Sequence, residues 1–311
     1  MPAHVPEGSE PLTPVAAATA PTVATTARGP LEYVETGTGH PVLALHGAMG
    51  GHDQSLLLGR TIGEAGYRYI AVSRPGYLGT PLRAGRSPED QADLFAEALD
   101  ALGVRSAAVM AVSGGGPSAI QFAVRHPDRC AALVLVSTCG GRIDTPIPLS
   151  FHLTKQLMRW SWFAETMRRK AARDPAGAAA RSIEDPSVRA RTLADPEAGP
   201  LFRELLLSTL DRPALRLPGT ENDIAVTRAT ADYPLERITT PVLVVHGTAD
   251  RVVPYEHAQV LATRIRGAEL LTIERGEHVA IFTHRETVRA RVTRFLRQHA
   301  TPGGESGTGR S

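Results

Sequence analysis

The stretch 107-AAVMAVSGGGPSA-119 holds the first residues in the chain that could do chemistry. An apolar run ends at Ser113 and is followed by three consecutive glycines and Pro117. Three interpretations compete: a phosphate-binding loop, a tight turn without chemistry, and a turn that exposes a serine nucleophile. The phosphate interpretation is disfavoured, because no lysine lies nearby and the glycines lack the spacing G-x-G-x-x-G. A plain Ser-Gly turn stays open on this stretch alone.

A serine nucleophile on a strand-to-helix turn needs very small neighbours, usually in the pattern G-x-S-x-G, because strand and helix pass close together. The chain reads 111-AVSGG-115, so Gly115 supplies the second glycine and Ala111 replaces the first. Pro117 suits the first turn of a helix that begins directly behind Ser113. The pattern is incomplete, so other residues must test it.

A nucleophilic serine also needs a base, and an acid that orients the base. Asp250 follows an apolar run in 246-HGTADRVVP-254, and His278 follows the last apolar run in 275-RGEHVAIF-282. The carboxyl ends of parallel strands meet at one edge of a sheet, so these residues are expected to lie beside Ser113. We predict that Ser113 is the nucleophile, His278 the base and Asp250 the acid.

The negative charge that develops on an attacked carbonyl oxygen needs hydrogen-bond donors. One donor is expected to be the backbone N–H of Gly114, the residue after the serine. The other is expected in the glycine-rich turn 45-LHGAMGG-51, with Ala48 as the first choice and Met49 as the second.

Other polar residues near the expected strand ends have a weaker claim to catalysis. Asp144 is the rival for the acid, but the context H-G-x-x-D favours Asp250. His46 and His246 each precede a glycine at a strand end and are predicted to anchor loops. No set of His, Cys or acidic residues has metal-ligand spacing, so neither a metal nor another cofactor is predicted.

These residues need a scaffold, and the chain alternates short apolar runs with longer amphipathic ones. This alternation is typical of a mostly parallel sheet with helices on both faces. The apolar runs predict strands at 42–47, 68–75, 107–113, 131–137, 242–247 and 269–274. The amphipathic runs predict helices at about 54–66, 88–103, 117–126, 255–265 and 285–299. The predicted fold class is therefore α/β.

The alternation stops between 142 and 236, where leucine and aromatic residues recur every three or four positions. We predict that 142–236 is a helical cap, inserted into a core formed by 30–141 and 237–300. Residues 1–29 are rich in Ala, Thr and Pro and lack a basic n-region, so a disordered leader is expected rather than an export signal. Residues 301–311 are expected to form a flexible tail.

The composition limits the partners. The 311 residues carry 34 Lys+Arg and 32 Asp+Glu, a formal net charge of +2, and contain no run of like charges that would bind nucleic acid or a membrane. No stretch approaches the roughly 18 apolar residues that span a bilayer. Cys130 and Cys139 flank one predicted strand, about 30 Å apart, and are expected to be free thiols. A cytoplasmic protein with a small-molecule partner is predicted, and its oligomeric state stays open.

Together the motifs resemble those of the α/β-hydrolase family. The turn at 45–51 resembles the family's oxyanion motif, 73-SRPGYLGT-80 its D-R-x-G-x-G-x-S turn and 111–115 its nucleophile elbow. The stretches 246–254 and 276-GEH-278 resemble its acid and histidine motifs. The resemblance covers all of the chain but the tails, and it implies an α/β-hydrolase fold with a helical cap. Two residues depart from the pattern: Ala111 stands in place of the first elbow glycine, and Ser73 in place of the aspartate of the turn.

The resemblance and the three candidate residues predict a serine hydrolase that cleaves an ester, lactone or thioester of a small, largely apolar molecule through an acyl-enzyme. Trp160, Trp162 and Phe163 of the cap are candidates for lining its pocket, although ordinary helix packing explains the same spacing. Two alternatives stay open: a slow-turnover ligand receptor of the same fold, and a carbon–carbon bond hydrolase or acyltransferase in a biosynthetic pathway.

Overall fold

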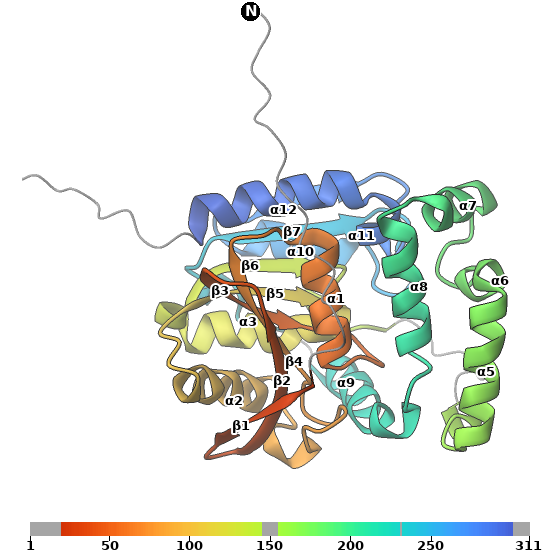
Figure 1. Cartoon of the computed structure of the whole chain (residues 1–311). Helices are drawn as coiled ribbons and strands as arrows, with labels where there is room; N and C mark the ends of the chain where they lie inside the picture. The colour runs from red at the N-terminus through yellow and green to blue at the C-terminus, as the bar shows by residue number, and fades with distance from the viewer. Residues whose placement is uncertain (1–19, 145–154, 231, 301–311) are drawn as a thin grey trace, which may run out of the picture.

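An eight-stranded sheet forms the centre of the protein (Figure 1). The computed structural model describes residues 20–144, 155–230 and 232–300. The strand order is β1-β2-β4-β3-β5-β6-β7-β8, and all neighbours are parallel except the pairs β1–β2 and β2–β4. The strands are β1 (Thr22–Thr26), β2 (Gly29–Thr36), β3 (His40–Leu45), β4 (Tyr67–Val72), β5 (Ala107–Val112), β6 (Cys130–Val136), β7 (Val242–Gly247) and β8 (Glu269–Ile273). The predicted α/β class is confirmed.

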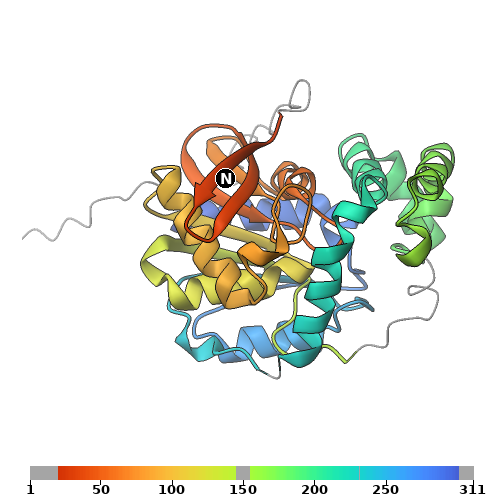
Figure 2. The same ribbon diagram turned by 90° about the horizontal axis from the view of Figure 1, so that it is seen from below.

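Helices cover both faces of this sheet (Figure 2). Successive residues of a strand point to opposite faces, so Val42 packs in one buried cluster with residues of α1, α11 and α12, and Leu43 packs in another with residues of α2, α3 and α10. This double burial explains why the central strands read as continuous apolar runs. The helices are α1 (His52–Ile62), α2 (Pro88–Ala101), α3 (Gly116–Arg125), α10 (Glu256–Arg264), α11 (Ala280–Thr283) and α12 (Arg285–His299).

Every helix and strand predicted from the sequence forms, with ends within four residues of the expected ones. The start of α2 shows why the local signals were reliable. Ser87 Oγ accepts the Asp90 N–H at 3.0 Å, and the Asp90 carboxylate accepts the Ser87 N–H at 3.4 Å, so two N–H groups of the helix end are satisfied reciprocally.

The prediction of a disordered leader over residues 1–29 is wrong for its last part. Residues Thr22–Thr26 form β1, which pairs antiparallel with β2 at the edge of the sheet. Arg28, in the turn between the two strands, forms ion pairs with Asp90 and Asp93 of α2. This hairpin is held by strand pairing and by contacts with a distant helix, neither of which shows in the Ala-, Thr- and Pro-rich composition of residues 1–29. Residues 1–19 and 301–311 lie outside the described residues.

The interval expected to be a helical insertion carries helices between β6 and β7. They are α5 (Ser161–Arg173), α6 (Pro175–Ala179), α7 (Pro186–Ala194), α8 (Ala198–Ser208) and α9 (Leu217–Ala229). Helix α8 lies beside α1 and α11, and α7 contacts α11 (Figure 1). Ile183 and Phe202 of this interval are fully buried in the same cluster as α1 and α12, so the insertion shares the apolar interior on that side of the sheet.

Cys130 and Cys139 are buried free thiols, as expected. Burial raises the pKa of the Cys130 thiol to about 12 and that of Cys139 to about 11. Both thiols therefore stay protonated and unreactive near neutral pH. In the part of the chain that the structure describes, no helix has the length and apolar character needed to cross a bilayer.

Candidate active site

Ser113 lies between β5 and α3 in a left-handed backbone conformation, with a φ of +52°. Such a conformation is strained for a residue other than glycine, and a tight strand-to-helix turn uses it to lift a hydroxyl above the sheet edge. The surroundings are crowded: a Cβ on Gly47 would lie 3.0 Å from Ser113 Cβ, and one on Gly115 would lie 2.7 Å from His46 O. Small residues are therefore required around Ser113.

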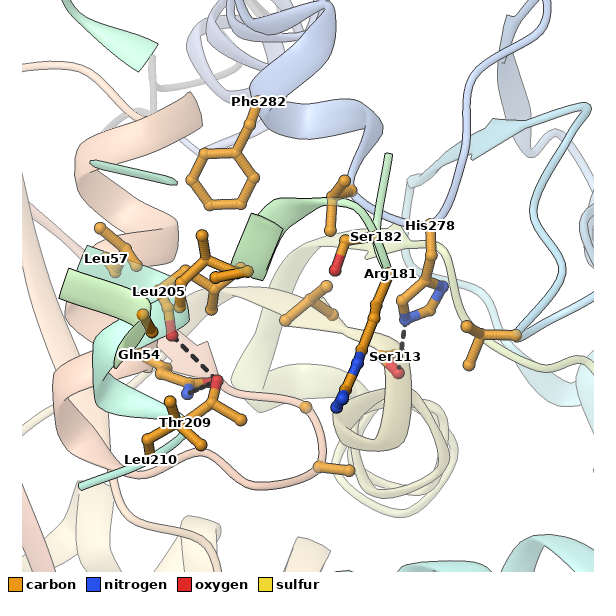
Figure 3. A pocket seen from close by; sticks show the side chains of 18 of the residues that line it. Gln54, Leu57, Ser113, Arg181, Ser182, Leu205, Thr209, Leu210, His278 and Phe282 are labelled. Atoms are coloured by element: carbon orange, nitrogen blue, oxygen red, sulfur yellow. Dashed lines mark hydrogen bonds between the residues drawn. The ribbon is translucent and has the colours of Figure 1, made fainter. Parts of the chain in front are cut away.

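The structure brings Ser113, His278 and Asp250 together (Figure 3). His278 Nε2 is 3.1 Å from Ser113 Oγ, and His278 Nδ1 is 2.7 Å from Asp250 Oδ2. These residues follow β5, β7 and β8, whose carboxyl ends meet at one edge of the sheet. When Nδ1 carries the ring proton and donates a hydrogen bond to the carboxylate, Nε2 is free to accept the proton of the serine hydroxyl.

Asp250 is buried, and its carboxylate is held by several donors. Oδ1 accepts the backbone N–H groups of Val252 and Val253, each at 2.9 Å, and Oδ2 lies 3.3 Å from His246 Nε2. Burial alone would raise the pKa of Asp250, but hydrogen bonds from His246 and His278 outweigh it and hold that pKa well below its usual range. Asp250 therefore stays ionised beside His278 over the whole physiological range.

Asp144, the rival for the acid, is placed differently. Its carboxylate is exposed and accepts a hydrogen bond from Arg142 Nε at 2.7 Å. His246 also has a defined role, because its Nε2 lies 2.9 Å from the carbonyl oxygen of Val253 in the acid loop. This contact agrees with the loop-anchoring role predicted for His246.

The two residues named first as oxyanion donors lie close together. A Cβ on Gly114 would be 3.5 Å from Ala48 N, so the turn that carries Ala48 packs against the residue after Ser113. Met49, the second choice, has its N–H engaged: it donates to Thr220 Oγ1 at 2.9 Å. The geometry therefore favours Ala48 and Gly114 over Met49.

His46 and a buried arginine hold the turn that carries Ala48. His46 Nδ1 lies 2.6 Å from Gly47 O, and its Nε2 accepts the Arg74 backbone N–H at 2.9 Å. Burial, together with the positive charge of Arg74, holds the pKa of His46 well below its usual range, so the ring is neutral. Arg216, fully buried, donates to both oxygens of Asp53 on α1 at 3.0 and 2.7 Å and approaches Met49 O at 3.5 Å.

Sequence reasoning missed a buried ion pair behind the elbow. Arg74 donates to Asp223 Oδ1 at 3.0 Å and to Oδ2 at 2.5 Å, and Tyr77 OH donates to Oδ2 at 2.6 Å. Arg74 lies in the stretch that resembles a family turn, but Asp223 sits on α9 of the insertion, where no local motif marks it. The pair links the insertion to Arg74, whose Nε also donates to the His46 carbonyl oxygen at 2.8 Å.

Ser73 stands where the family turn has an aspartate, and a carboxylate from another strand compensates for this difference. Glu32 on β2 accepts hydrogen bonds from Ser73 Oγ at 2.6 Å and from the Gly79 N–H at 3.1 Å, and its Oε2 lies 2.9 Å from His52 Nδ1. Burial alone would raise the pKa of Glu32, but these hydrogen bonds lower it to about 2. Glu32 thus supplies the anion that the aspartate of the family turn would bring.

A cavity of about 490 Å³ opens beside Ser113 and His278. On the core side it is lined by apolar residues of α1, the His278 loop and α11, among them Leu57, Leu58, Val279, Ile281 and Phe282. On the insertion side it is lined by α8, the end of α5 and the residues around α6, namely Met167, Lys170, Ala171, Asp174, Gly177, Ala178, Arg181, Ser182, Leu205, Leu206, Thr209 and Leu210.

The prediction for the three aromatic residues is wrong for this cavity. Trp160, Trp162 and Phe163 do not line it, and the two tryptophan side chains are 62% and 63% exposed. Phe163 packs instead against a small cluster formed by Met158, Ala164 and Leu217. Helical spacing locates an apolar stripe, but it does not determine whether the stripe faces the cavity, the interior or solvent.

Within the described residues, no group of three or more His, Cys, Asp or Glu side chains is arranged to hold a metal ion. The sheet order, with helices on both faces, defines the class of the protein as an α/β-hydrolase fold. The family model for the alpha/beta hydrolase fold matches residues 40–285. An alpha/beta hydrolase fold protein from Nakamurella multipartita has a similar structure, with a TM-score of 0.81 and 36% identity over 89% of this chain and 99% of that one.

Two curated relatives extend the comparison. The uncharacterized hydrolase YcgS of Bacillus subtilis (strain 168) is 31% identical over 81% of this chain and 89% of its own length. A 2-hydroxy-6-oxononadienedioate/2-hydroxy-6-oxononatrienedioate hydrolase of Burkholderia vietnamiensis is 28% identical over 86% of this chain and 91% of its own length. The chain belongs to the alpha/beta hydrolase fold family, and it is a hydrolase of that fold.

Proposed function

We propose that this hydrolase cleaves an ester, lactone or thioester bond of a small, largely apolar molecule, with Ser113 as the nucleophile. The proposal rests on one observation: Ser113 Oγ, His278 and Asp250 form a continuous chain of contacts, of 3.1 and 2.7 Å, at the wall of a mainly apolar cavity. A pocket of this kind accepts an apolar acyl group and presents its carbonyl to the serine.

In the proposed reaction, Ser113 Oγ attacks the carbonyl carbon while His278 Nε2 takes the hydroxyl proton. The Ala48 and Gly114 N–H groups donate to the oxyanion, and Asp250 stabilises the imidazolium cation. His278 then protonates the leaving oxygen or sulfur, and the acyl group stays on Ser113. A water molecule, deprotonated by His278, releases the acid and restores the serine. The helices of the insertion act as a cap that shapes the acyl site.

The Ser113→Ala variant tests the proposal. We expect it to lower the rate of p-nitrophenyl butyrate hydrolysis by about 10⁴ or more, since the nucleophile is lost. A fluorophosphonate probe should label the native chain at Ser113 and leave the variant unlabelled. Ser161→Ala, at the exposed start of α5, is the matched control and should keep normal rates.

Normal activity in Ser113→Ala would contradict the mechanism. Repeated release of p-nitrophenol supports the enzyme, whereas a single stoichiometric burst would favour the slow-turnover receptor of the same fold. Both outcomes are read from the same time course, so one experiment separates the two classes.

A second candidate, hydrolysis of a carbon–carbon bond next to a ketone, uses the same three residues. The similarity to the Burkholderia vietnamiensis enzyme over 91% of its length favours it. The compound in that enzyme's name can be assayed beside p-nitrophenyl butyrate. A markedly higher kcat/KM for that compound would replace the ester proposal with the carbon–carbon one.

A further inference from the structure

The two sides of the cavity beside Ser113 differ in polarity and charge. The core side is mainly apolar apart from Gln54 and the candidate catalytic residues, whereas the insertion side presents Lys170, Asp174 and Arg181. The Asp174 carboxylate is already used, because its Oδ1 accepts the Gly177 N–H at 2.8 Å and caps α6. The two cations therefore exceed the one acid, so the wall of this mainly apolar cavity is net positive.

Several other cations of the insertion are held by carboxylates. Arg168 and Arg169 both pair with Glu165, at 2.8 and 2.7 Å, and Lys155 pairs with Glu221 at 3.0 Å. In the described part of the chain, no carboxylate lies within ion-pair distance of Lys170 Nζ or of the Arg181 guanidinium. Both residues are exposed although they line the cavity, so their charges are accessible to an incoming anion.

The segment that carries Arg181 is fixed relative to the catalytic histidine loop. Its neighbour Ile183 is fully buried, and the Ile183 N–H donates to Ala179 O at 2.9 Å. The Glu184 N–H donates to both carboxylate oxygens of Glu277, at 2.9 and 3.1 Å, directly before His278. Figure 3 shows the Arg181 side chain extending into the cavity in the direction of Ser113.

We propose that Arg181, assisted by Lys170, forms an anion subsite that binds a carboxylate group of the substrate. The inference rests on the proposed function and narrows it, since the favoured substrates are esters or thioesters whose acyl chain carries a free carboxylate. The guanidinium offers two parallel N–H donors that match a carboxylate, and the Lys170 ammonium adds a second positive charge. The apolar core wall would hold the carbon chain between the carboxylate and the scissile carbonyl.

A pair of substrates of equal length tests the subsite. The p-nitrophenyl monoester of glutaric acid carries a terminal carboxylate, and p-nitrophenyl valerate has a methyl group at that place. The quantity of interest is the ratio of kcat/KM for the acid to that for the neutral ester. In Arg181→Gln we expect this ratio to fall by about 10- to 100-fold, because a charge-assisted hydrogen-bond pair is lost; Lys170→Gln should lower it by less.

Arg173→Gln is the matched control, because Arg173 is an exposed cation at the end of α5 that does not line the cavity. It should leave the ratio unchanged. An unchanged ratio in Arg181→Gln would overturn the proposal. An equal fall of the ratio in Arg173→Gln would also overturn it, because the effect would then come from the long-range attraction of any nearby positive charge.

A binding measurement keeps the subsite testable if the protein turns over neither ester. The Ser113→Ala variant is titrated calorimetrically with monophenyl glutarate and with its methyl ester. Tighter binding of the acid, lost when Arg181→Gln is added, supports the subsite even if the ester-hydrolase proposal fails. Equal binding of the two compounds would overturn the subsite and leave the hydrolase proposal intact.

Discussion

The Asp223 carboxylate of α9 lies directly against Gly114 in the turn behind Ser113: a Cβ on Gly114 would sit 2.8 Å from Asp223 Oδ2. An unpaired anion at this place would oppose the negative charge that develops on a bound carbonyl oxygen. Arg74 and Tyr77 donate to the same carboxylate, so the pair leaves little net charge near the proposed oxyanion donors. The insertion therefore supports the elbow as well as covering the cavity.

Asp223→Asn should lower both stability and rate. The change leaves the Arg74 guanidinium buried without its counter-charge, which typically costs about 3–5 kcal/mol of unfolding free energy. Urea unfolding followed by circular dichroism measures this loss. Replacing both partners by apolar residues, Arg74→Met with Asp223→Leu, should restore part of it.

Glu165→Gln is the comparison for Asp223→Asn, since Glu165 pairs with arginines at the exposed surface of α5. Surface pairs contribute about 0–1 kcal/mol, so its effect should be small. Equal losses of unfolding free energy in Asp223→Asn and Glu165→Gln would show that the buried ion pair stabilises the fold no more than a surface pair does.

Glu32→Gln should change how stability depends on pH. The pKa of Glu32 is lowered from 4.5 to about 2 in the folded protein, so the unfolded chain takes up the proton first as the pH falls. The stabilisation, up to about 3 kcal/mol, is thus fully present above pH 4.5 and is lost between pH 4.5 and 2. The variant should be less stable at neutral pH, with a flatter profile in that acid window.

Urea midpoints measured from pH 7 down to pH 2 check this expectation. Glu35→Gln is the control on the same strand, because Glu35 pairs with Arg68 near the surface. If the urea midpoint of Glu32→Gln falls between pH 4.5 and 2 as steeply as that of the native chain, another carboxylate controls the loss of stability in this pH range.

The parts of the fold that local physics dictates could be predicted from the sequence. Strands buried on both faces read as apolar runs, and the start of α2 carries its own cap at Ser87 and Asp90. The β1–β2 hairpin was missed, because β1 lies at the end of a stretch rich in Ala, Thr and Pro, and the contacts that hold it, such as that of Arg28 with Asp93 on α2, join residues distant in sequence. Asp223 and Arg181 were missed for the same reason: their importance comes from what the fold brings next to them.

The position of Ala111 shows how the fold tolerates a departure from the elbow pattern. Ala111 is fully buried at the end of β5, in the same apolar cluster as Ala119 and Ala123 of α3. Small residues on the helix that follows the elbow leave space for one extra methyl group. Glycine at position 111 is therefore not required for the strand and helix to approach.

Asp250→Asn, compared with Asp144→Asn, decides which acid acts. Asparagine keeps the size of Asp250, but its NH2 group can donate a hydrogen bond to His278 Nδ1. This favours the tautomer with the proton on Nε2, which cannot accept the proton of Ser113. We expect kcat for p-nitrophenyl butyrate to fall by about 10⁴. Asp144→Asn, which removes only an exposed pair with Arg142, should leave kcat close to the native value. The reverse order would move the acid to Asp144, and equal small effects would mean that His278 needs no carboxylate partner.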